Sequence, residues 1–183
     1  MAYSLPKGSW IVSDLFGRDQ MLVAFDKLAS ELARRRISAN LFVVGGAAIA
    51  LAYSAERRTR DIDAGFTNTA EVYEAAHNVA RRMKLPRDWL NDAVRSYLLG
   101  DDAESQVVYE NGSLQVAVAS PHYILAMKLL SARPRQDQDD IRLLYNLCGY
   151  RSVEDGLNLL QRYLPDQPIP ERSVDILEEL FGE

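Results

Sequence analysis

The sequence predicts an α+β fold, in which a small mixed β-sheet is flanked by helices and followed by a C-terminal helical extension. Three observations predict it. Extended runs at residues 41–44 and 59–66 are separated by a glycine pair and a helix-favouring segment. Two β-type runs, residues 106–109 and 114–119, flank an Asn-Gly dipeptide, the strongest short-range hairpin signal. The segments after residue 120 have helical spacing.

Size and composition indicate an ordinary globular protein. The chain has 183 residues, 48% hydrophobic and 26% charged, enough for a full core. We expect residues 1–120 to form a core with an N-terminal helix, and residues 121–183 to form a helical region packed on it as one compact unit. No apolar stretch approaches the ~18 to 20 residues of a membrane span, and no signal peptide is evident.

Charge and cysteine content further limit the classes of protein to which this chain can belong. The net charge of −5 argues against a protein that holds nucleic acid by bulk electrostatics, although a local basic groove is compatible with it. The single cysteine, Cys148, lies in an apolar context and is expected to be a buried thiol. We therefore expect a cytoplasmic protein that has no membrane partner.

The first half of the chain alternates between helical and extended patterns. An amphipathic helix is expected from Ser13 to Arg36, then a buried strand from Leu41 to Val44. A glycine pair follows, then a small, helix-favouring segment from Ala47 to Ala55. Thr59 to Phe66 is extended, with apolar residues alternating against two aspartates.

More helices are expected further along. One opens after Thr67-Asn68-Thr69 and ends near Leu85, and another is expected over the segment PRDWLNDAVRSYL, residues 86–98. After the hairpin, Ser120-Pro121 caps a helix. Three further helices are expected at Asp137–Leu147, Val153–Leu164 and Pro170–Phe181.

Asp61 and Asp63 are candidate metal ligands. Residues i and i+2 of a strand point to one face, so the two carboxylates lie about 6 to 7 Å apart at the backbone. Burying them unpaired costs several kcal/mol, so a cation between them is expected. Magnesium is usually bound through one or two carboxylates together with substrate phosphates. Taken alone, an Asp-x-Asp pair is more often a solvent-facing pair on an amphipathic edge strand.

Gly45 and Gly46 supply the complementary half of such a site. Without side chains, they let backbone amides approach a phosphate, and the following helix start favours an anion. A glycine pair alone is often only a tight turn into a helix. The conjunction is more specific, because strand, glycine pair, helix and Asp-x-Asp strand occur in that order with 14 residues between Gly46 and Asp61. A nucleoside triphosphate with its magnesium satisfies both halves.

This stretch, FVVGGAAIALAYSAERRTRDIDAGF, resembles the opening motif of the nucleotidyltransferase superfamily with the DNA polymerase β-like fold. More narrowly, LAMKLLSARPRQDQDDIRLL looks like the second signature of the AbiEii-like toxin nucleotidyltransferases and their small bacterial relatives. The two signatures cover about residues 40–145. The resemblance implies a small mixed sheet of the polymerase β-like type.

The resemblance also implies roles for single residues. Gly45, Gly46 and Arg60 would hold the nucleotide, and Asp61 and Asp63 would bind magnesium. Two magnesium ions are implied, and manganese could replace them. The other arginines of residues 57–60 could border the cleft, although exposed, solvated side chains are an equal expectation.

The second signature supplies the rest of the implied site. Lys128 would contact phosphate, and Asp137 or Asp140 would complete the acidic site as a catalytic residue. This allocation departs from many relatives, which place a third carboxylate on a later strand; the run VVYENGSLQVAVAS carries only Glu110, in the turn. Without the resemblance, Lys128 would be a core lysine whose amine reaches water, and the aspartates a solvated helix start.

The resemblance implies a nucleotidyltransferase that moves a nucleoside monophosphate from a nucleoside triphosphate to an RNA (tRNA-like) or protein acceptor. Relatives of the AbiEii type are toxins of toxin-antitoxin pairs, so an antitoxin partner is also implied. The alternative is a catalytically weak or inactive module of the same fold that binds a nucleotide or a partner protein. A purely structural domain would leave the paired aspartates unexplained.

Overall fold

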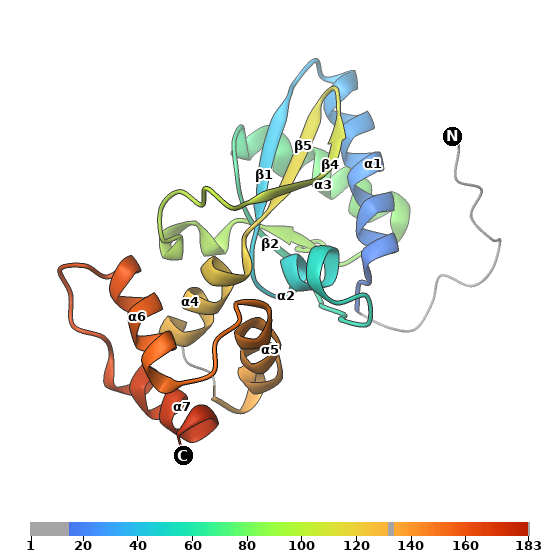
Figure 1. The fold of residues 1–183 in the computed structure, drawn as a ribbon. Helices are drawn as coiled ribbons and strands as arrows, with labels where there is room; N and C mark the ends of the chain where they lie inside the picture. The colour runs from blue at the N-terminus through green and yellow to red at the C-terminus, as the bar shows by residue number, and fades with distance from the viewer. Residues whose placement is uncertain (1–14, 132–133, 183) are drawn as a thin grey trace.

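A computed structural model describes residues 15–131 and 134–182 of the chain. In these residues a five-stranded mixed sheet has the order β3-β2-β1-β5-β4 (Figure 1), which confirms the predicted α+β fold. Strand β1 pairs antiparallel with β2 and parallel with β5. The strands are β1 (Ala39–Val43), β2 (Ile62–Phe66), β3 (Leu90–Asn91), β4 (Gln106–Asn111) and β5 (Leu114–Val118).

One face of the sheet is covered by helices α1 (Arg18–Arg34) and α3 (Thr69–Met83), which pack against each other. Burial alternates along β1, β2 and β5, as was predicted for β2, and the buried apolar residues of the three strands point to this face. Helix α1 is shorter than expected, because Phe16 makes a β-bridge to Thr59; the expected start at Ser13 lies outside the described residues.

The predicted helix over residues 86–98 is wrong. The segment instead forms the short strand β3, which pairs in parallel with β2, followed by a 3₁₀ turn, η2 (Ala93–Tyr97). Tertiary contacts of Trp89 explain the difference. The Trp89 side chain is fully buried, and its indole Nε1 donates to the Ala76 carbonyl at 3.0 Å. The backbone carbonyl of Trp89 accepts from the Ile62 amide at 2.7 Å. The edge strand thus places Asn91 beside the Asp-x-Asp strand.

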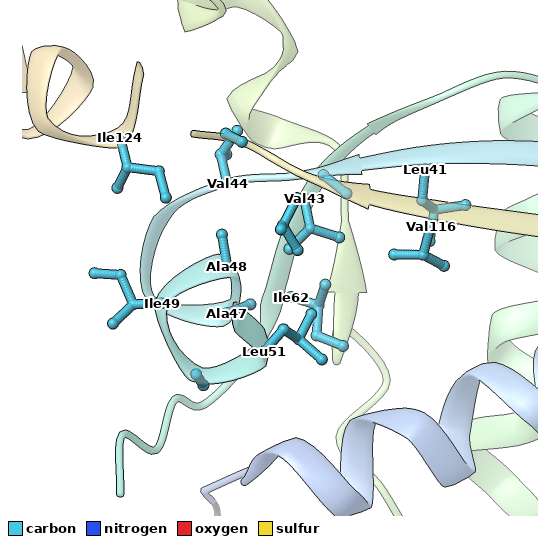
Figure 2. Close-up of a cluster of buried hydrophobic side chains, with 14 of the residues drawn as sticks. Leu41, Val43, Val44, Ala47, Ala48, Ile49, Leu51, Ile62, Val116 and Ile124 are labelled. Carbon is cyan, nitrogen blue, oxygen red and sulfur yellow. The ribbon is translucent and has the colours of Figure 1, made fainter. Parts of the chain in front are cut away.

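The predicted helix after the glycine pair forms in two parts, α2 (Gly45–Ala48) and a π-helical turn, η1 (Ile49–Tyr53). Figure 2 shows Ala47, Ala48 and Ile49 of this segment in one apolar cluster with Val43 of β1 and Ile62 of β2. Because these small side chains are fully buried, the glycine turn is fixed against the ends of two strands.

The predicted hairpin forms, but its turn is Gly112-Ser113 alone, so Glu110, which was expected in the turn, belongs to β4. The C-terminal helices are also confirmed, and Figure 1 shows α4 leading from the end of β5 into the other three. They are α4 (Pro121–Ser131), α5 (Pro134–Leu147), α6 (Val153–Tyr163) and α7 (Glu171–Phe181). Cys148 is half-buried after α5, and burial raises its thiol pKa to about 12. Across the described residues, no helix is long and apolar enough to span a bilayer.

Candidate active site

The glycine turn lies directly beside the Asp-x-Asp strand. The amide of Val44 donates to the carbonyl of Asp63 at 3.0 Å, which ties the end of β1 to the start of β2. Gly45 has a φ of +63°, a left-handed conformation that side chains disfavour. A Cβ at this position would meet only the Asp63 carboxylate, 3.7 Å from Oδ2. The first glycine of the turn and the Asp63 carboxylate therefore lie side by side at one end of the sheet.

Asp61 and Asp63 form a carboxylate pair at the start of β2. Burial, followed by the charges of Asp63 and Asp88, raises the pKa of Asp61 above its ordinary value. Its Oδ2 accepts a hydrogen bond from Asn91 Nδ2 at 3.3 Å. Within the described part of the chain, neither Asp61 nor Asp63 forms an ion pair. Two repelling, half-buried carboxylates without a cation fit a magnesium ion held through them and through substrate phosphates.

A second acidic group lies between α4 and α5 and has its own cation. Lys128 Nζ contacts Asp137 Oδ1 at 2.5 Å and Asp140 Oδ2 at 2.9 Å. The three side chains are only 11%, 13% and 7% exposed. Their charges offset one another within a largely dry environment, where an unpaired member would be costly. This cluster therefore contains its own cation, whereas the Asp61–Asp63 pair has none among the described residues.

Arg57 connects the Lys128 cluster to the glycine turn. Its Nη2 donates to Asp140 Oδ2 at 2.9 Å, across 83 residues of sequence. The same Nη2 lies 3.6 Å from the position that a Cβ on Gly46 would take, and Thr59 Oγ1 lies 3.2 Å from it. The absence of a side chain at Gly46 therefore gives Arg57 and Thr59 room beside the turn. Together these contacts bring the two sequence signatures to one place.

The remaining predicted site residues are placed as follows. Arg60 is exposed, and in the described residues it forms no ion pair. Asp137 and Asp140 lie with Lys128 and not with the Asp61–Asp63 pair, and among the described residues no group of three His, Cys, Asp or Glu side chains could hold a metal. The roles assigned to these residues stay predictions.

Asn91 is a site residue that the sequence did not predict. It lies in the segment expected to be helical, and only its pairing in β3 beside β2 brings its amide to Asp61. No local pattern signals this contact, because Asn91 is 30 residues away from its partner in sequence.

A glycine turn beside an Asp-x-Asp strand on a small mixed sheet defines the class of protein: the nucleotidyltransferases. The chain belongs to the family described as "Nucleotidyltransferase of unknown function" (DUF6036), which matches residues 20–154. This range includes all the site residues described above, from Gly45 to Asp140. Comparison with curated proteins and with solved structures gave no match.

Proposed function

We propose that this chain is a magnesium-dependent nucleotidyltransferase, which moves a nucleoside monophosphate from a nucleoside triphosphate to a hydroxyl group of an RNA or a protein. The observation that carries the proposal is the pair Asp61 and Asp63, half-buried beside Gly45 and without a protein cation in the described residues. Membership of a nucleotidyltransferase family supports the same reaction class.

In the proposed reaction the acceptor oxygen attacks the α-phosphorus, and the bond from that phosphorus to the pyrophosphate oxygen breaks. Such a transfer depends mainly on positioning and on cations placed against the developing charge. Asp61 and Asp63 would hold one or two magnesium ions, which activate the hydroxyl group and neutralise the leaving pyrophosphate. Asn91 donates to the Asp61 carboxylate, and Gly45 and Gly46, which have no side chains, would let their amides approach phosphate oxygens.

The test is a screen of the four α-labelled ribonucleoside triphosphates against total cellular RNA and protein, with and without magnesium. Label is expected in one macromolecule, dependent on one or more of the triphosphates. The variants Asp61→Asn and Asp63→Asn keep the size of each side chain but remove its charge, and both should abolish labelling. Labelling that is unchanged in both variants would show that the carboxylates do not hold the metal.

A second candidate function is a nucleotide-binding module without catalysis. It is favoured by the contacts of Asp137 and Asp140, since both already pair with Lys128 and neither lies free beside the Asp61–Asp63 pair. Calorimetry with each triphosphate separates the two functions when it is combined with an assay for pyrophosphate. Tight binding without pyrophosphate release, with RNA and protein acceptors present, would favour the module.

A toxin role, with an antitoxin as partner, is the narrower proposal. The likeness of the segment around Lys128 and Asp140 to the AbiEii-like toxins supports it. Induced expression in a bacterial host is expected to arrest growth for the wild-type chain and not for Asp63→Asn. If both chains arrest growth equally, nucleotide transfer is not the cause; if neither does, the toxin role fails.

A further inference from the structure

Arg57 is the cation placed at the glycine turn. Its Nη2 lies 3.6 Å from the position of a Cβ on Gly46, and its side chain is 38% exposed, so an anion at the turn can reach the guanidinium. The side chain is also anchored: Nη2 donates to Asp140 Oδ2 at 2.9 Å, and Nη1 donates to the Arg58 carbonyl at 3.2 Å.

Arg57 has a hydrogen-bonding capacity that the described residues do not use. Its Nε is buried and has no hydrogen-bond acceptor among them. Buried donors are nearly always paired, so an unpaired donor beside a proposed ligand site needs an explanation. A planar guanidinium carries five donors in a fixed fork that matches phosphate oxygens, and the exposed part of the Arg57 side chain can take up a polyphosphate at the turn.

Lys128 has the opposite properties. It is 11% exposed, and its ammonium is held between Asp137 and Asp140 at 2.5 and 2.9 Å. To contact a phosphate it would have to leave Asp137 without a cation among the described residues, and Asp140 with Arg57 alone, which is unfavourable for buried carboxylates. The contacts therefore favour a structural role for Lys128, in contrast to the role implied by the sequence resemblance.

We propose that Arg57 is the side chain that binds the triphosphate at the glycine turn, and that Lys128, Asp137 and Asp140 form the buried network that positions it. This inference rests on the proposed function, whose substrate carries the polyphosphate. Asp140 is the link, because its Oδ2 accepts a hydrogen bond from Arg57 at 2.9 Å and forms an ion pair with Lys128 at 2.9 Å. Lys128 in turn holds the Asp140 carboxylate in a fixed place against Arg57.

The test uses inorganic tripolyphosphate with magnesium, because this probe needs no knowledge of the base or of the acceptor. Its affinity is measured by calorimetry for the wild-type chain, Arg57→Gln and the matched control Arg58→Gln. Arg58 carries the same charge on the same loop, but its Nη1 donates to the Ala55 carbonyl, and its side chain packs beside Gly17. Arg57→Gln should weaken binding by about ten- to a hundredfold, as expected for charge-assisted hydrogen bonds. Arg58→Gln should stay within about twofold.

A double-mutant cycle tests the positioning role of Lys128. If Lys128 acts only through Arg57, then Lys128→Met weakens binding in the wild-type background and has little further effect in the Arg57→Gln background. If Lys128 contacts phosphate directly, the two losses add, which would overturn the positioning role. Asp137→Asn serves as a milder second variant, and circular dichroism confirms that each variant is folded.

The outcomes separate this inference from the proposed function. Equal binding of tripolyphosphate by the wild-type chain and Arg57→Gln overturns the role of Arg57 and leaves nucleotide transfer unaffected. No binding by the wild-type chain also overturns it. Binding that depends on Arg57, in a chain that never labels a macromolecule or releases pyrophosphate, supports the inference and removes the catalytic proposal.

Discussion

Replacing Lys128 by methionine removes the cation between Asp137 and Asp140 while keeping a flexible apolar stem of similar length. Among the described residues, Asp137 then has no cation, and Asp140 keeps only Arg57. Breaking a buried ion pair by removing one partner typically costs 3–5 kcal/mol. Because Arg57 still pairs with Asp140, we expect a loss near the lower end, about 3 kcal/mol of unfolding free energy.

The measurement is urea denaturation at 25 °C, supported by thermal unfolding, in which a loss of this size corresponds to a fall of about 6 to 12 °C in a chain of this length. The control is Lys27→Met on the exposed face of α1, which should stay within about 0.5 kcal/mol of the wild-type chain. In the double variant Lys128→Met/Asp137→Asn, the second substitution removes the charge of Asp137 that has lost its partner. The double variant should therefore recover part of the lost unfolding free energy. A Lys128→Met variant as stable as the control would refute the buried network.

Three further predictions concern the strands and the turn. Gly45→Ala should cost about 1 to 2 kcal/mol, because its φ of +63° strains any side chain, whereas Gly112→Ala, with open space around it, should be nearly neutral in the same denaturation experiment. Trp89→Ala should cost about 3 to 5 kcal/mol of unfolding free energy by the same measurement. Tyr97 is 71% exposed, so Tyr97→Ala should change the unfolding free energy little. Equal effects of the two substitutions would contradict the buried edge strand. Asp61→Asn should raise the melting temperature at neutral pH. Burial raises the pKa of Asp61 in the folded state. The contribution of Asp61 to stability is therefore present below its unfolded-state pKa and is lost as the pH rises through its folded-state pKa. The gain should therefore vanish below about pH 3, and a gain of equal size at both pH values would contradict a penalty that arises from the buried Asp61 charge.

Local patterns predicted those elements whose signals agree with their packing. The alternation of Ile62, Ala64 and Phe66 against Asp61 and Asp63 fixes which face of β2 is buried, and this alternation is found in the structure. The Asn-Gly hairpin is equally local, because turn chemistry and β-type runs point to the same register.

Local patterns failed where distant contacts decide. The segment from Pro86 carries a helix-start signal, yet burial of Trp89 and pairing with β2 make it an edge strand. The identity of ion-pair partners was equally inaccessible: Arg57 and Asp140 are 83 residues apart, and only the packed fold shows that Asp140 binds protein cations. The same contacts indicate that Arg57, rather than Lys128, is the cation at the glycine turn.

The central claim is that Asp61 and Asp63 hold the metal for nucleotide transfer. It is tested most directly by measuring magnesium-dependent transfer of label from an α-labelled triphosphate for the wild-type chain and Asp63→Asn side by side, with Asp139→Asn, an exposed aspartate outside both clusters, as the control. Transfer is expected from the wild-type chain and the control, with a loss of at least about a hundredfold in Asp63→Asn. Transfer by Asp63→Asn at the wild-type rate would contradict the claim.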